Sequence, residues 1–302
     1  MFNVGSISRQ QLMEILDDHR TDLAALEGFK QFSHVRPVKA MKGSLYLWDT
    51  PVGVPSSGGQ TSKVSPGQPT PQGNLGLGTV DYTCHEFALD NPLPKSAQKE
   101  IAAISGADLS ELVRNASLKV LRDFNADIAT LLKGDDADYA ITERTINDKW
   151  DTSSATPIED VDAIVKALRG GGELTAVVGW DVASALSKAA KITGSSAGSG
   201  REYVNFEGVA MFLRERGIKN VWIDGSAQQN GEPNFARSYN GVYDGVFAVF
   251  PRNALITALF TDLDNDVFED KKTRSVFHHA EFVAGAARSR ATSVIYGDTL
   301  TA

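Results

Sequence analysis

The most regular hydrophobic pattern lies in the middle of the chain. Apolar residues recur every three or four positions between Leu109 and Leu131, which predicts an amphipathic helix. Asp108 and Glu111 form a variant of the capping box at its start, and Lys133 stands in its expected last turn. At 1.5 Å per residue, such a helix spans roughly 39 Å, about the width of a domain. We therefore expect it to act as a strut.

Beyond residue 150 the pattern alternates between helix-like and strand-like segments. Thr156 is the expected N-cap of a helix that begins at Pro157 and ends near Gly170. The segments that follow predict, in order, a strand, two helices, a strand and three further strands: ELTAVVG, WDVASALSKAAK, VNFEGVAMFLRERG, KNVWIDG, GVFAVF, ALITALF and FVAGAARSRATSVIYG. This order predicts an α/β layer that takes in GVFAVF and ALITALF, within a protein of the α+β class.

Two strand-like segments precede the long helix and enclose an unusual stretch. SLYLW and VDYTCHEFAL are predicted to be the arms of a long hairpin, with Tyr82 and Cys84 on one face and Glu86 as a further candidate for that face. Between the arms, twelve of the 28 residues from Pro51 to Gly78 are Gly or Pro, and none is acidic or aromatic. This stretch cannot bury enough apolar surface to fold alone. A flexible linker between domains is the alternative interpretation.

The N-terminal segment and the overall composition narrow the class of protein. Residues 6–30 carry Leu12, Ile15, Leu16, Leu23 and Leu26 among many charges, which predicts one or two short surface helices or an arm. A formal net charge of −8 argues against a dedicated nucleic-acid reader. Cys84 is the single cysteine, and no apolar run reaches the ~20 residues that cross a bilayer. With no secretory signal at the start, we expect a soluble protein in a reducing compartment.

Three short motifs resemble sites of chemistry, but their contexts do not support them. Residues 194–198 match G-x-S-x-G, yet a helix-like segment precedes the serine where a nucleophile elbow needs a strand. Asp262, Asp264 and Asp266 imitate the start of a calcium loop, but Val267 and Thr273 occupy the places of its glycine and glutamate. A solvated acidic loop is the preferred interpretation.

The third motif joins His278, His279 and Glu281, which lack the histidine spacing that a helix offers to zinc. We expect these residues to form a polar strand face. The sequence thus predicts no catalytic, cofactor-binding or metal-binding residues, no cofactor, and a protein that is not an enzyme.

The order of the segments resembles the Hong Kong 97 fold of the major capsid proteins of tailed double-stranded DNA bacteriophages. The resemblance runs from about Lys39 to the C-terminus and is carried by these stretches: TVDYTCHEFALDNPLPKSAQKEI, WDTSSATPIEDVDAIVKAL, ELTAVVGWDVASALSKAAKI and VAMFLRERGIKNVWIDGSAQQNGEP. It implies an N-terminal arm (1–38), an extended loop (39–81), a peripheral domain with the long spine helix (82–149, completed by 278–302) and an α/β axial domain (150–277).

This resemblance also implies a function. Pentamers and hexamers of the chain would form the icosahedral head that encloses double-stranded DNA without reading its sequence, assembled in the bacterial cytoplasm and carried in the virion. The expected partners are a separate scaffolding protein, a portal and decoration proteins. No association with a membrane is expected. Lys63 is the only lysine at the tip of the loop. Because no asparagine and glutamate partners for Lys63 can be matched in the sequence, no covalent lysine–asparagine crosslink is predicted. The alternatives are an encapsulin-type compartment shell and a soluble α/β enzyme with a long loop.

Overall fold

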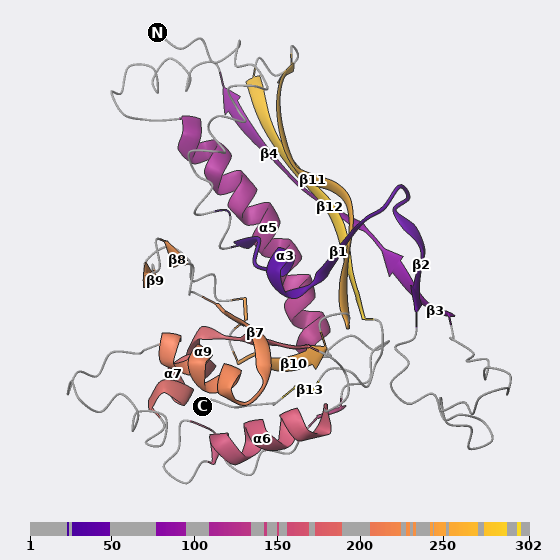
Figure 1. The fold of residues 1–302 in the computed structure, drawn as a ribbon. Coiled ribbons are helices and arrows are strands. Elements are labelled where there is room, and N and C mark those ends of the chain that lie inside the picture. The colour runs from indigo at the N-terminus through magenta and orange to yellow at the C-terminus, as the bar shows by residue number, and fades with distance from the viewer. Residues whose placement is uncertain are drawn as a thin grey trace, which may run out of the picture.

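The computed structural model describes residues 23, 26–48, 77–94, 109–133, 142–143, 150, 156–168, 173–188, 206–224, 228–229, 232–233, 242–243, 245–251, 254–270, 275–288 and 295–296. These residues form a long four-stranded sheet, a separate five-stranded sheet with its own helices, and two small hairpins (Figure 1). The mixture of helix and strand agrees with the predicted α+β class.

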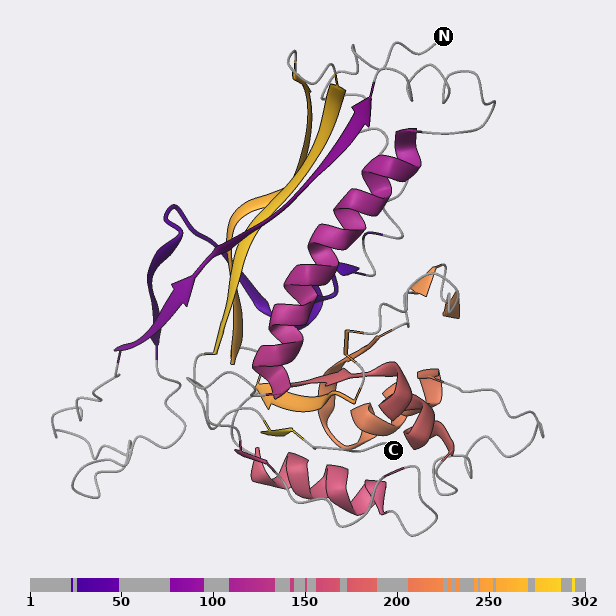
Figure 2. The same cartoon turned by 180° about the vertical axis from the view of Figure 1, so that it is seen from behind.

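The four-stranded sheet carries the longest helix of the described chain along one face. Its strands, in spatial order, are β1 (His34–Pro37), β11 (Leu255–Asp270), β12 (Ser275–Arg288) and β4 (His85–Pro94). β1 runs parallel to β11, and the other pairs are antiparallel. α5 (Leu109–Lys133) lies along this sheet in both views (Figures 1 and 2). The predicted strut is confirmed, while its Asp108 cap lies outside the described residues.

The five-stranded sheet contains most of the predicted α/β layer. Its strands, in spatial order, are β5 (Thr142–Glu143), β13 (Ile295–Tyr296), β10 (Phe247–Pro251), β6 (Leu174–Val178) and β7 (Ile218–Ile223). Its helices are α6 (Pro157–Ala167), α7 (Trp180–Lys188) and α9 (Phe206–Glu215). Because α7 and α9 connect β6 to β7, these two strands run parallel.

Three details of the sequence prediction are wrong. ALITALF begins β11 and belongs to the four-stranded sheet, not to the α/β layer. FVAGAARSRATSVIYG covers two strands, β12 and β13, that lie in different sheets. Thr156 precedes α6 as expected and Pro157 is its first residue, but the Thr156 side chain makes no capping hydrogen bond. Periodicity marks a strand, but it does not say which sheet the strand joins.

The predicted hairpin is present and consists of β2 (Lys42–Trp48) and β3 (Leu77–Thr83), which pair in antiparallel register. The Gly- and Pro-rich stretch joins its two strands; residues 51–76 lie outside the described residues, and Leu77 and Gly78 begin β3. VDYTCHEFAL is two strands rather than one, because the chain leaves β3 at Cys84 and then enters β4, which pairs with β12. The two remaining short strands, β8 (Gln228–Gln229) and β9 (Glu232–Pro233), pair only with each other.

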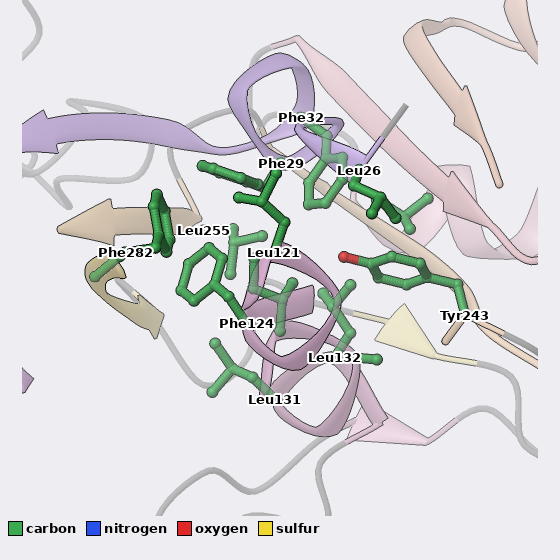
Figure 3. Close-up of a cluster of buried hydrophobic side chains, with 14 of the residues drawn as sticks. Leu26, Phe29, Phe32, Leu121, Phe124, Leu131, Leu132, Tyr243, Leu255 and Phe282 are labelled. Atoms are coloured by element: carbon green, nitrogen blue, oxygen red, sulfur yellow. The ribbon is translucent and has the colours of Figure 1, made fainter. Parts of the chain in front are cut away.

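The first core lies between α5 and the four-stranded sheet. Phe124 of α5 meets Phe29 at 5.0 Å and Phe282 at 5.1 Å between ring centroids, in edge-on contacts (Figure 3). Phe29 and Phe32 belong to the short helix α3 (Phe29–Phe32) and are fully buried there. Phe29 lies within residues 6–30, which were expected to form a surface helix or arm, and it is instead part of the core; Phe32, just beyond that segment, is also part of the core.

A buried polar bridge fixes the N-terminal segment and the strut together within this core. The Asn125 amide of α5 donates to the carbonyl of Leu26 (2.8 Å), and the Tyr243 hydroxyl donates to Asn125 Oδ1 (3.3 Å). Such buried groups are costly unless paired, so the bridge holds one particular arrangement of the three segments.

The second core belongs to the five-stranded sheet, and its residues lie close together in the sequence. β6 is buried at every position: Leu174, Ala176 and Val178 pack with α6, α7 and α9, whereas Val177 belongs to the first core. Trp150 packs against Phe247 at 5.0 Å and donates a hydrogen bond from Nε1 to Asp160 of α6 (3.0 Å). All of its buried members lie between Trp150 and Val249, so this core is assembled from neighbours in sequence.

Candidate assembly surfaces

Near its β1 end, the face of the four-stranded sheet that points away from α5 is covered by the β2–β3 hairpin. The cluster contains residues of the β3 segment together with residues of β11 and β12: Val80, Tyr82, Cys84, Ile256, Ala258, Val283 and Ala287. Tyr82 and Cys84 share a face as predicted, whereas Glu86 is exposed. In both views the hairpin lies on the opposite side of the long strands from α5 (Figures 1 and 2). We call this covered area the proximal half of the outer face.

The route of the chain out of the hairpin depends on a glycine. A Cβ atom on Gly285 of β12 would lie 2.1 Å from the carbonyl oxygen of Thr83, so only glycine permits this crossing. Beside it, the Cys84 amide donates to the Met41 carbonyl (2.7 Å), and the Tyr82 hydroxyl donates to the Ala40 carbonyl (3.1 Å). These contacts fix the direction in which the hairpin leaves the body.

The other part of the outer face is not covered by the hairpin, and we call it the distal half. Strand pairing arranges its side chains in three rows across β11, β12 and β4: Asp264, Glu281 and Ala88; Asp266, His279 and Asp90; Phe268, Phe277 and Pro92. Phe268 and Phe277 stack almost parallel, with centroids 5.3 Å apart, and Phe268 remains 44% exposed. An exposed stacked aromatic pair next to charged residues is typical of a contact surface.

His279 lies among the carboxylates of this distal half. Its Nδ1 is 2.6 Å from Asp90 Oδ1, and its Nε2 is 3.4 Å from Glu281 Oε2. Partial burial alone would lower the pKa of His279, but hydrogen bonds to Asp90 and Glu281, with their charges, raise it overall. Four carboxylates in two adjacent rows thus surround one titratable cation.

The aspartates that imitate a calcium loop lie in a strand, so the expectation of an acidic loop is wrong. The side chain of each accepts a hydrogen bond from the backbone amide of the next residue, as at Asp262 (2.9 Å) and Asp266 (2.8 Å). Such local bonds favour turns in isolated chains. Here the pairing with β12 prevails, with register shifts between Leu259 and Asp264.

The predicted polar strand face is correct for two of its three residues. His279 and Glu281 point outward, but His278 points toward α5 and is only 3% exposed. Its Nε2 lies 2.9 Å from Asn265 Oδ1, which also accepts from the Ser117 hydroxyl of α5 (3.2 Å). Burial, and to a smaller extent the charge of His279, lowers the pKa of His278 to about 4, so it is neutral at neutral pH.

Positive charge gathers at the base of the hairpin, at Lys39 and Lys42. Both side chains are exposed, as is Arg36 at the end of β1. Among the described residues, none of these three cations forms an ion pair. Lys63 and the G-x-S-x-G stretch at 194–198 lie outside the described residues.

Few features of the described residues suit a metal-binding or ligand-binding site. No group of three or more of their His, Cys, Asp and Glu side chains is placed to hold a metal ion. A hollow of about 160 Å³ beside β7, lined in part by Phe32, Arg214 and Trp222, is smaller than the roughly 300–1,000 Å³ of a usual ligand pocket. None of the described helices combines the length and the apolar character needed to span a bilayer.

Sequence reasoning missed Gly285, Asp90 and the pair Phe268 and Phe277. These residues act through partners on other strands, at separations that no local motif records. A period-two pattern could assign Phe277 and His279 to one face, but it could not say which face the hairpin leaves open.

Comparison with known proteins identifies the fold, although no protein-family model and no curated protein sequence matches the chain. A phage-related protein from Bordetella bronchiseptica RB50 is similar at 14% identity and a TM-score of 0.58, over 92% of each chain. The capsid of cyanophage P-SCSP1u is similar at 12% identity and a TM-score of 0.54, over 89% of this chain and 87% of that one.

A third similar structure is a virus-like particle from Pyrococcus furiosus, at 10% identity and a TM-score of 0.57, over 94% of this chain and 98% of that one. In these three comparisons the likeness extends over 89%, 94% and 92% of this chain. The chain therefore has the Hong Kong 97-like fold of phage major capsid proteins.

Proposed function

We propose that this protein is the major capsid protein of a tailed double-stranded DNA bacteriophage, a subunit of an icosahedral shell. The observation that carries the proposal is the fold likeness, which extends over about nine tenths of both chains in comparisons with a phage capsid and a phage-related protein. The surfaces described above support it, because they suit contacts between copies better than they suit a reaction. Shell formation draws its free energy from many repeated interfaces rather than from one site.

The two sheets correspond to two proposed domains of the shell subunit. The five-stranded sheet with α6, α7 and α9 corresponds to the axial domain, whose copies would meet around the axes of pentamers and hexamers. The four-stranded sheet with α5 corresponds to the peripheral domain, and by its strand pairing β11 belongs with it. The arm (1–38) and the extended loop (39–81) complete this proposed division. A virion location, assembly in the host cytoplasm, and separate scaffolding, portal and decoration proteins belong to the same proposal.

The stretch between β2 and β3 is proposed to lie across a neighbouring subunit. Its composition supports this, since a segment rich in Gly and Pro gains order only on another surface. Deleting residues 53–76 should leave a folded chain that fails to form complete shells. Complete shells from the deletion variant, seen by electron microscopy, would contradict this role.

Imaging is the direct test of the proposed function. The full chain, alone and co-expressed with a separate scaffolding protein, is expected to form pentamers, hexamers and closed shells by negative-stain microscopy and light scattering. A protein that stays monomeric or dimeric at high concentration under both conditions would rule out a shell.

An encapsulin-type compartment is the second candidate, favoured by the likeness to the virus-like particle. The contents of shells purified from the native source separate the two candidates. Double-stranded DNA supports the phage capsid, whereas a single enriched enzyme found by mass spectrometry supports the compartment.

A further inference from the structure

A small hollow lies where the N-terminal segment meets the edge of the five-stranded sheet. It has a volume of about 160 Å³ and lies beside β7, the edge strand of that sheet. The Phe32 ring of α3 and the Trp222 ring of β7, whose centroids are 5.2 Å apart, line part of it. Most of the remaining lining residues are polar and come from α3, β6, β7 and α9. The hollow therefore borders segments from both halves of the molecule.

The lining of the hollow includes a buried hydroxyl group without a partner. Thr175 of β6 is only 1% exposed, and its Oγ1 forms no hydrogen bond with a described residue. Because side chains alternate along a strand, Thr175 lies on the same face of β6 as Val177, which packs in the first core. A buried hydroxyl that lacks a hydrogen bond is destabilising, so this group calls for a partner from outside the chain.

An irregularity in strand pairing brings two further polar residues to the same place. The register shifts by one residue between Leu174 and Thr175, so Lys219 of β7 is an extra residue with no counterpart on β6. Bulges of this kind redirect side chains and are frequent beside functional sites. Lys219 and the next residue, Asn220, which pairs with Thr175, both line the hollow.

The charge of the lining favours an anion. Arg214, in the last turn of α9, is exposed and forms no ion pair with a described residue. Lys219 pairs with Glu173, which does not line the hollow, so the charge of Lys219 is balanced and that of Arg214 is not. None of the described residues that line the hollow is acidic. Guanidinium and ammonium groups, together with neutral O–H and N–H donors, are the groups that bind phosphate.

We propose that this hollow binds one small oxyanion of the phosphate class, held by Arg214 and Lys219 and accepting a hydrogen bond from the Thr175 hydroxyl. The side-chain amides of Asn220 and Gln31 supply further N–H donors from the lining. Gln31 belongs to α3, whereas the other donors belong to the five-stranded sheet and to α9. A bound anion therefore links the two halves of the molecule and stabilises their arrangement. The site does not depend on the proposed function.

Titration of the full chain with inorganic phosphate, at an ionic strength kept constant with sodium chloride, tests the site. Phosphorus NMR and calorimetry should show saturable binding of one phosphate per chain. Arg214→Gln should weaken this binding by at least about tenfold, because it removes a charge-assisted contact. Lys166→Gln is the matched control, since it removes an exposed cation from the last turn of α6, away from the hollow, and should leave the binding unchanged.

A second variant tests the buried hydroxyl separately from the charge. Thr175→Val keeps the branched shape of the side chain, so without phosphate it should unfold at the same temperature as the natural chain or at a higher one. It should bind phosphate about threefold or more weakly, and phosphate should raise its unfolding temperature by less.

Three outcomes would count against the site. Absence of saturable binding, or equal binding by the natural chain and all three variants, would overturn it. Binding that is lost in Arg214→Gln but unchanged in Thr175→Val would place the phosphate on surface charge alone, and the hollow would not be the site. Displacement of phosphate by short double-stranded DNA would assign the site to a DNA backbone and contradict a free anion as its ligand.

Discussion

His278 and His279 are neighbours on β12, yet they lie on opposite faces of the four-stranded sheet. His278 is buried against α5, bonded to a neutral amide, and has its pKa lowered to about 4. His279 is partly exposed, contacts two carboxylates, and has its pKa raised. The same alternation separates the buried Phe282 from the stacked Phe277. One strand therefore serves the interior of its own molecule with one set of side chains and presents a charged surface with the other.

Truncating a phenylalanine on each face should give the largest difference. Phe282→Ala removes a ring that meets both Phe29 and Phe124, and it should lower the free energy of unfolding by about 3–5 kcal/mol. Phe268→Ala on the outer face should cost less than about 1 kcal/mol, because that ring is already half exposed. Urea denaturation of the unassembled chains measures both. Equal losses would abolish the distinction between the two faces.

The next largest effect concerns the crossing at the base of the hairpin. Gly285→Ala places a methyl group against the Thr83 backbone and should lower the free energy of unfolding by about 1–3 kcal/mol. Gly43→Ala is the graded control, since its Cβ would meet the Tyr82 hydroxyl at 3.0 Å and that side chain can shift. Thermal unfolding compares the two. A Gly285 variant as stable as the Gly43 variant would mean that the hairpin does not depend on this crossing.

Acid should destabilise the folded chain through protonation of His278, the histidine that faces α5. Because the pKa of His278 is about 4 in the folded chain and 6.5 in the unfolded chain, the unfolded state binds more protons between these values. The contribution is fully present above pH 6.5 and is lost as the pH falls toward 4, at a cost of roughly 3 kcal/mol. His278→Gln keeps a donor toward Asn265 without titrating, so it should lose less stability between pH 7 and 4.5. Parallel loss in both proteins would assign the acid sensitivity elsewhere.

The outward histidine should have the smallest effect and the opposite sign. Since the pKa of His279 is raised, its contribution is present below pH 6.5 and disappears as the pH rises through the folded value. His279→Gln should therefore cost under about 1 kcal/mol at pH 6 and almost nothing at pH 9. A loss that persists at pH 9 would indicate packing rather than charge.

Much of the architecture follows from local pattern. The strut was predictable because an apolar position recurs at each turn of α5, and α6 because Pro157 marks its start. The β2–β3 hairpin followed from two strand-like segments on either side of a stretch that cannot fold alone. In each case the signal lies within the element itself.

The rest depends on partners that are distant in sequence. Nothing around Phe29 indicates that it meets Phe124 and Phe282, and nothing in VDYTCHEFAL marks the change of partner at Cys84. The charged distal half of the outer face could not be predicted for the same reason, because Asp90, Asp266 and His279 are neighbours only through strand pairing. The acidic run at 262–266 led to a wrong prediction of a loop. Its residues favour a turn, but pairing with β12 places them in a strand.

β12 lies between β11 and β4, and it is the last strand of its sheet along the chain. A ribosome that stalls before Ser275 consequently releases a polypeptide in which β4 and β11 have nothing to join them. Such a fragment cannot complete the four-stranded sheet, so this sheet closes only once the last of its strands has been synthesised.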